Sequence, residues 1–170
     1  MLHPAIAHFA ISLPIISLVL GLLYLFKPSE MMSKITSRFF VFAAIFVIAA
    51  YFTGKNDAKV VFEFLSNDAK ALLVQHAQLG LYLAIGMGLV AVLKFVGCMK
   101  NIFKLELLSI VLLLVLSGAI LFQGKMGGQL TFEYGAHVKV AQDLGKQVKV
   151  MKEELSMCSD DDEDEDEDEE

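Results

Sequence analysis

Residues 105–123 read LELLSIVLLLVLSGAILFQ and contain a single charged side chain, Glu106. A helix of this length is about 28 Å long, close to the ~30 Å of a bilayer's hydrocarbon core. Three other stretches, residues 4–26, 35–53 and 71–93, are similarly apolar. We therefore predict an all-α, integral membrane four-helix bundle.

The composition outside these stretches supports a membrane protein. The chain has 170 residues, of which 56% are hydrophobic, and a mean hydropathy of +0.60. Of its 20 acidic residues, 11 form an unbroken run at residues 160–170, so the remainder carries 14 basic and 9 acidic groups. A soluble domain carries about 25% charged residues. The scattered lysines and single arginine form no basic stripe, which excludes nucleic acid as an expected partner.

Three regions follow from this pattern. We predict a four-span membrane domain at residues 1–140, an amphipathic helix at residues 141–158 and a disordered acidic tail at residues 159–170. The amphipathic stripe is formed by Ala141, Leu144, Val148, Met151 and Leu155, and both an interfacial helix and a homo-oligomer seam would explain it.

Two connections are predicted in more detail. Residues 56–70 have an apolar face and capping signals typical of a short surface helix on the bilayer interface. After the fourth span, Gly124, Gly127 and Gly128 are expected to end the helix.

An even number of spans places both termini and the loop after the second span on one side of the membrane. All four histidines, His3, His8, His76 and His137, belong to those segments. Six Lys and Arg side chains flank the other side and five flank this one, so the positive-inside rule favours both termini outside. We expect a multi-pass protein of the bacterial inner membrane with its histidines near the outer face.

His8 and His76 are the preferred site residues, because each lies four or five residues inside its span. An ionisable residue within a span is a functional candidate by default. Gly80, Ala84 and Gly88 follow His76 at intervals of four, and this seam of small residues predicts that His76 faces the bundle.

Two kinds of metal site fit these residues. Haem b could be held by His8 and His76 with Gly80 and Ala84 beside it, whereas copper or zinc would use His3 and His8 with His137. Two cysteines, Cys98 and Cys158, give no CxxCH haem-attachment motif. The expected function is electron transfer, by a carrier or binding module rather than an enzyme.

Other functions remain compatible with the sequence. One is a non-redox membrane interaction module or complex subunit without a cofactor, and another is a metal-ion binding or transfer protein. Besides membrane lipid, the acidic tail suggests a basic soluble redox protein as partner, steered by charge, although solubility alone would also explain the tail.

Several short motifs resemble a known family. His3-Pro4, His8-Phe9, Thr53-Gly54, His76 with Gly80, Gly127-Gly128-Gln129-Leu130 and Tyr134-Gly135 are similar to the bacterial membrane proteins catalogued as domain of unknown function 2231. The resemblance covers about residues 1–140. It implies a four-span inner-membrane domain, sometimes found with redox proteins, whose chemistry is not established. His137 departs from the family pattern, and the C-terminal helix and tail lie outside it.

Overall fold

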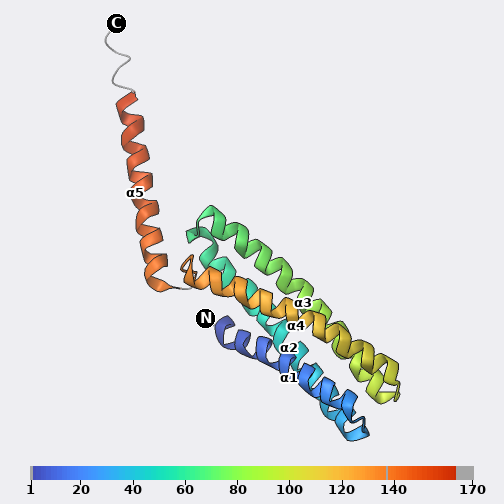
Figure 1. Cartoon of the computed structure of the whole chain (residues 1–170). Helices are drawn as coiled ribbons and strands as arrows, with labels where there is room; N and C mark the ends of the chain where they lie inside the picture. Colours follow the sequence, from blue (N-terminus) through green and yellow to red (C-terminus); the bar gives the residue numbers. More distant parts are fainter. Residues whose placement is uncertain (1, 137, 164–170) are drawn as a thin grey trace.

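Five α-helices and one 3-10 turn make up the described chain (Figure 1). The computed structural model describes residues 2–136 and 138–163, and for residues 139–142 and 156–163 it describes the backbone alone. The elements in order are α1 (His3–Phe26), α2 (Glu30–Val61), η1 (Phe62–Phe64), α3 (Asn67–Met99), α4 (Phe103–Phe132) and α5 (Lys139–Glu163). Helices α1, α3, α4 and the combined α2 and η1 are each long and apolar enough to cross a membrane.

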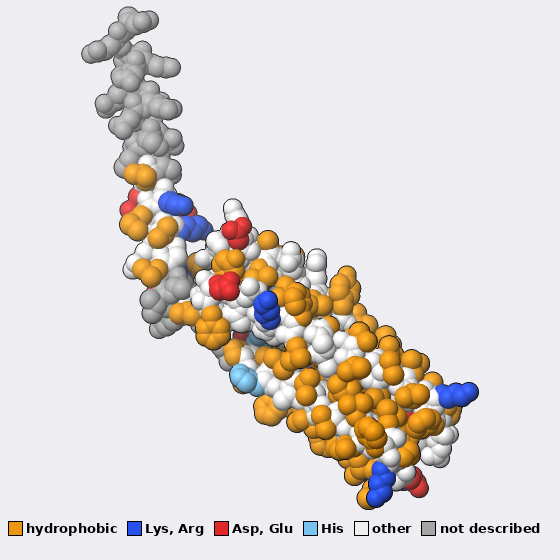
Figure 2. Space-filling model, in the orientation of Figure 1, with side chains coloured by type: hydrophobic (Ala, Val, Ile, Leu, Met, Phe, Trp, Pro, Cys, Tyr) orange, Lys and Arg blue, Asp and Glu red, His pale blue; other side chains and the backbone are white. Residues whose placement is uncertain are grey.

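The four apolar helices form an antiparallel bundle, as the sequence predicts. Each packs against the next in the chain, and α4 closes the ring by packing on α1. Phe40, Ala43, Met87 and Leu113, all fully buried, lie in the main core. The outer surface is also apolar, with Lys and Arg side chains towards the ends of the bundle (Figure 2). An apolar outside is what a bundle surrounded by lipid requires.

Polar side chains define the turns. Ser29 and Ser66 cap α2 and α3, since their hydroxyls accept hydrogen bonds from the backbone N–H groups of Met32 and Ala69. Asn101 lies in the tight turn between α3 and α4 with a φ of 52°. Asparagine tolerates this left-handed conformation better than most residues.

The predicted surface helix at residues 56–70 is wrong. Its first part continues α2, its centre is η1, and its end begins α3 after Ser66. Val61 of this region is instead buried in a second, smaller core with Leu73, Leu130 and Ala136, and Ala58 and Leu65 pack partly buried against it. The helices therefore extend beyond the predicted spans and cover a small core at one end.

The glycines of α4 do not end that helix, contrary to the prediction. Gly124 lies against Ile11 of α1 and Gly127 against His76 of α3, so each glycine allows a close helix contact. The helix ends at Phe132, and the following turn uses Gly135, whose φ is 65°. Close packing, rather than helix termination, explains Gly124 and Gly127, whereas a Cβ at Gly128 would have no described atom within 4 Å.

The predicted amphipathic C-terminal helix is present as α5, which projects away from the bundle (Figure 1). Near its start it contacts η1, where Lys146 Nζ lies 5.1 Å from the centre of the Phe64 ring. Leu144, Val148 and Met151 are exposed. The α5 backbone extends into the acidic run, and residues 164–170 of the predicted disordered tail lie outside the described residues.

Gly97→Ala should lower the free energy of unfolding by about 1–3 kcal/mol, as overpacking does. A Cβ at Gly97 would lie 2.8 Å from Glu106 Cγ and 3.1 Å from the Glu106 backbone nitrogen. Gly118→Ala is the matched control, since no atom lies within 4 Å of its Cβ position. Thermal unfolding in detergent measures both variants. A Gly97→Ala protein as stable as Gly118→Ala would contradict the packing at this contact.

Candidate functional site

The described histidines, His3, His8 and His76, lie at the end of the bundle where α1 and α3 begin and α2 and α4 end. Gly124 packs against Ile11 and Gly127 against His76. Because α1 and α4 are antiparallel, three residues along α4 lead from the level of Ile11 to that of His8. His8 and His76 therefore lie at a similar depth, and what distinguishes them is the direction of their side chains.

His3 is held against α2 by two neighbouring residues. A Cβ at Gly54 would lie 2.9 Å from His3 Cε1, so the ring rests directly on the α2 backbone. His3 Nδ1 lies 3.3 Å from Thr53 Oγ1, and this hydroxyl donates its proton to the Ala49 carbonyl at 2.8 Å. Thr53 must therefore accept from His3 Nδ1–H, which assigns the lone pair of the neutral ring to Nε2.

His76 contacts α4 and keeps one nitrogen without a partner. Its Cε1 lies 3.3 Å from the position of a Cβ on Gly127. Its Nδ1 is buried and makes no hydrogen bond within the described residues. An unpaired buried polar atom costs about 1–3 kcal/mol. The His3 ring lies at the same end of the bundle, where α1 begins.

Gln123 of α4 is a further member of this region. Its Nε2 donates to the His76 backbone carbonyl at 2.8 Å, which leaves Oε1 buried without a hydrogen-bond partner among the described atoms. The absence of a side chain at Gly80 makes room for it, since a Cβ there would lie 3.2 Å from Gln123 Nε2. The two open atoms, His76 Nδ1 and Gln123 Oε1, come from adjacent helices.

The residues predicted to form the site have different surroundings. His76 is mostly buried, Gly80 contacts Gln123, and Ala84 is part of the main core. His8 is exposed on α1, and its Nδ1 donates to the Pro4 carbonyl at 2.6 Å, so the structure does not bring it together with His76. His137 lies outside the described residues.

The chemistry available at this end is that of a small polar site. Three buried atoms near the ends of α2 and α4 and the start of α3 have no hydrogen-bond partner in the described structure and could accept a proton or bind a cation: Asp57 Oδ2, His76 Nδ1 and Gln123 Oε1. The described residues contain no group of three or more His, Cys, Asp or Glu side chains arranged for a metal ion. Sequence reasoning missed Thr53 and Gln123 as site residues, although Thr53-Gly54 is one of the motifs that carry the family resemblance.

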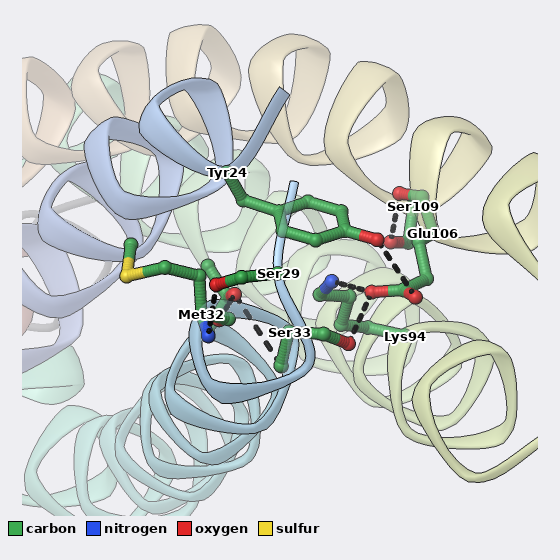
Figure 3. Close-up of polar contacts among 8 residues, drawn as sticks. Tyr24, Ser29, Met32, Ser33, Lys94, Glu106 and Ser109 are labelled. Carbon is green, nitrogen blue, oxygen red and sulfur yellow. Dashed lines mark hydrogen bonds and ion pairs between the residues drawn. The ribbon is translucent and has the colours of Figure 1, made fainter. Parts of the chain in front are cut away.

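A second polar cluster lies at the opposite end of the bundle and was not predicted (Figure 3). Lys94 of α3 forms an ion pair with Glu106 of α4, and the two residues are 0% and 3% exposed. Tyr24 of α1 donates to Glu106 Oε1 at 3.1 Å, and Ser33 of α2 donates to Oε2 at 2.7 Å. Lys94 Nζ also lies 4.3 Å from the centre of the Tyr24 ring.

This cluster is closed, in contrast to the histidine end. Both carboxylate oxygens of Glu106 have partners, and Ser109 donates to its backbone carbonyl at 2.7 Å. The described buried atoms without partners do not include any from this cluster. Because the described polar atoms of this cluster all have partners, none is available to bind a substrate. The role of the cluster is to join the helices.

A helical repeat in the sequence could have revealed Lys94. It follows Ala84, Met87 and Ala91 on the buried face of α3, at spacings of three and four. The predicted span stopped at residue 93 because a lysine normally marks the end of an apolar segment. The spanning helix therefore continues past the predicted boundary, and Lys94 is buried within α3 and paired.

Removing one member of the Lys94–Glu106 pair should destabilise the protein more than removing both. Lys94→Met or Glu106→Leu alone leaves a buried charge without its partner and should cost about 3–5 kcal/mol. The double variant should recover part of that loss. Thermal unfolding in detergent measures the change in stability for the two single variants and the double variant.

The exposed pair of Glu30 and Lys34, 2.6 Å apart, is the control for this cycle. Lys34→Met should change stability by about 0.5 kcal/mol or less, as expected for an i,i+4 surface pair. Additive effects of Lys94→Met and Glu106→Leu would show that the buried pair does not couple the helices.

The comparisons with known proteins give one family. The model described as "Predicted membrane protein (DUF2231)" matches residues 1–140, which comprise α1 to α4 and the turn after them. No curated protein and no solved structure matches the chain. The match thus covers both polar clusters and excludes nearly all of α5.

Proposed function

This chain belongs to the DUF2231 family of predicted membrane proteins, and we propose that in the membrane it binds a transition metal through His3 and His76. The observation that carries this proposal is the buried Nδ1 of His76, which has no partner in the described structure. Neutral imidazole nitrogen is a common ligand of copper, zinc and iron. A bound metal would remove the cost of leaving that nitrogen unpaired.

Two neighbours support the proposal. Thr53 fixes the His3 tautomer with its lone pair on Nε2, which is the arrangement by which outer partners orient metal-binding histidines. Gln123 Oε1 is an unpaired acceptor on the helix that packs against His76. Oxygen from this amide would complete a ligand set of two nitrogens and one oxygen.

The packing favours a metal ion over haem b. His3 and His76 rest directly on glycines of α2 and α4, with 2.9 Å and 3.3 Å to the positions of the missing Cβ atoms. A porphyrin needs open space beside its axial ligands, and His8, the ligand expected from the sequence, is exposed on α1. Copper suits a site with few ligands, and its two oxidation states would support the expected electron transfer.

The first test is the metal content of the full chain purified in mild detergent. We expect about one copper per chain by elemental analysis, and a weak visible spectrum rather than the strong blue-end absorption of haem. His76→Ala should lower the affinity for the metal at least about tenfold. His8→Ala, a change at an exposed ring of similar depth, should leave it unchanged.

Other results would exclude this proposal. Equal metal content in the His76→Ala and parent proteins would remove His76 as a ligand. Strong haem absorption that is lost in His8→Ala would restore the site expected from the sequence. A metal-free protein after loading with Cu⁺ or Cu²⁺ would favour the membrane interaction module, for which the exposed apolar stripe of α5 is the supporting observation.

Thr53→Val tests the orienting hydrogen bond separately. The substitution keeps the side-chain shape and removes the acceptor for His3 Nδ1–H, so metal affinity should fall about 10- to 100-fold, as loss of an outer partner typically causes. Thr131→Val is the control. Its hydroxyl also donates to a carbonyl one helical turn earlier, Gly127 at 3.1 Å, and forms no described contact with a histidine. Competition with a chelator of known affinity measures both; equal effects would contradict the role of Thr53.

A further inference from the structure

A hollow between α2 and α3 lies at the end of the bundle opposite the histidines. Its volume is about 580 Å³, within the usual range for ligand pockets. The basic residues Lys34 and Arg38 line one part, and the apolar residues Val41, Phe42, Phe95 and Met99 line another. Phe42 and Phe95 are 57% and 50% exposed, so the apolar part is open to the lipid side of the bundle.

The basic part of the hollow carries one more positive charge than negative charge. Glu30, Lys34 and Arg38 follow each other at intervals of four along α2, and all three also border a second hollow of about 350 Å³. Lys34 is paired with Glu30 at 2.6 Å. Arg38 forms no hydrogen bond or ion pair with any described residue. Its guanidinium is exposed and has five N–H donors for an external acceptor.

The depth of Arg38 limits what that acceptor can be. Helix α2 has 32 residues and is therefore about 48 Å long, roughly 18 Å longer than the hydrocarbon core. If both ends project equally, about six residues at each end lie among the headgroups. The Arg38 Cα, eight residues after Glu30, is then about 3 Å inside the hydrocarbon core, and its long side chain can reach back to the level of the lipid phosphates.

We propose that this hollow binds one anionic phospholipid, with its phosphate on Arg38 and an acyl chain against Phe42 and Phe95. Guanidinium and phosphate form charge-assisted, often paired hydrogen bonds, and basic pockets between spanning helices bind acidic headgroups. Among the described residues, Glu30 is the one carboxylate that lines the hollow, and Lys34 already pairs with it. The surplus positive charge opposes the cationic headgroup of a zwitterionic lipid. This inference is independent of the proposed metal site.

Lipid binding to the full chain in detergent tests the proposal. Native mass spectrometry would compare phosphatidylglycerol with phosphatidylcholine of the same acyl chains. We expect one phosphatidylglycerol to bind at least about tenfold more tightly than phosphatidylcholine. Arg38→Gln should abolish that preference, while Lys104→Gln should preserve it, because Lys104 is an exposed base at the same end that does not line the hollow.

Two further experiments distinguish a bound lipid from other ligands. Phe42→Ala should weaken phosphatidylglycerol binding about threefold or more, because it removes part of the apolar wall, and ~10 mM inorganic phosphate should not displace the lipid. Displacement by phosphate would identify an anion site and overturn the proposal. So would equal losses in Arg38→Gln and Lys104→Gln, or an unchanged preference in Arg38→Gln. Circular dichroism checks that every variant keeps its helices.

Discussion

The ion pair of Lys94 and Glu106 is the contact on which the bundle depends. In lipid, apolar side chains gain little by leaving their solvent, so helix association relies on packing and polar contacts. This pair draws one side chain from each spanning helix into a single cluster, since Glu106 receives hydrogen bonds from Tyr24 and Ser33 as well as the charge of Lys94. Because Lys94 and Glu106 are buried within the bundle, shifting one helix would leave a buried charge without its partner, so the cluster also fixes the register of the helices.

The two ends of the bundle differ in whether their buried polar atoms have hydrogen-bond partners. At the Glu106 end, both carboxylate oxygens accept hydrogen bonds, and Gly97 allows α3 to lie close to α4. At the other end, glycines at positions 54, 80 and 127 also bring helices or rings together, yet His76 and Gln123 retain open atoms. A rigid closed end can hold the helices in place while the other end keeps atoms available for a ligand.

The sequence predicts the four spans well because apolar composition and bilayer thickness leave few alternatives. It also predicts that Ala84 is buried, since helical spacing fixes the faces of α3 once one face is known. The prediction fails at residue types that can have either of two structural roles. A lysine commonly marks the end of a span, yet Lys94 is buried with a partner, and a glycine commonly ends a helix, yet Gly124 and Gly127 allow close packing.

The remaining site residues depend on contacts between distant segments, which periodicity does not encode. Whether His3 or His8 faces the site depends on how α1 is rotated relative to α2. The contact of the His3 ring with Gly54 sets this rotation. The predicted orientation, with both termini outside, stays a prediction, because it rests on the count of basic residues near the span ends.

The start of α1 has a kinetic consequence for the histidine site. His3 is the first residue of α1, and the capping residue Leu2 makes no side-chain hydrogen bond to the helix. Uncapped first turns fray on fast timescales and at little cost in free energy. His76, nine residues inside α3, has no such freedom. A ligand shared by the two rings would therefore be exchanged by unwinding one turn of α1, at a rate set by local opening, while the rest of the bundle stays folded.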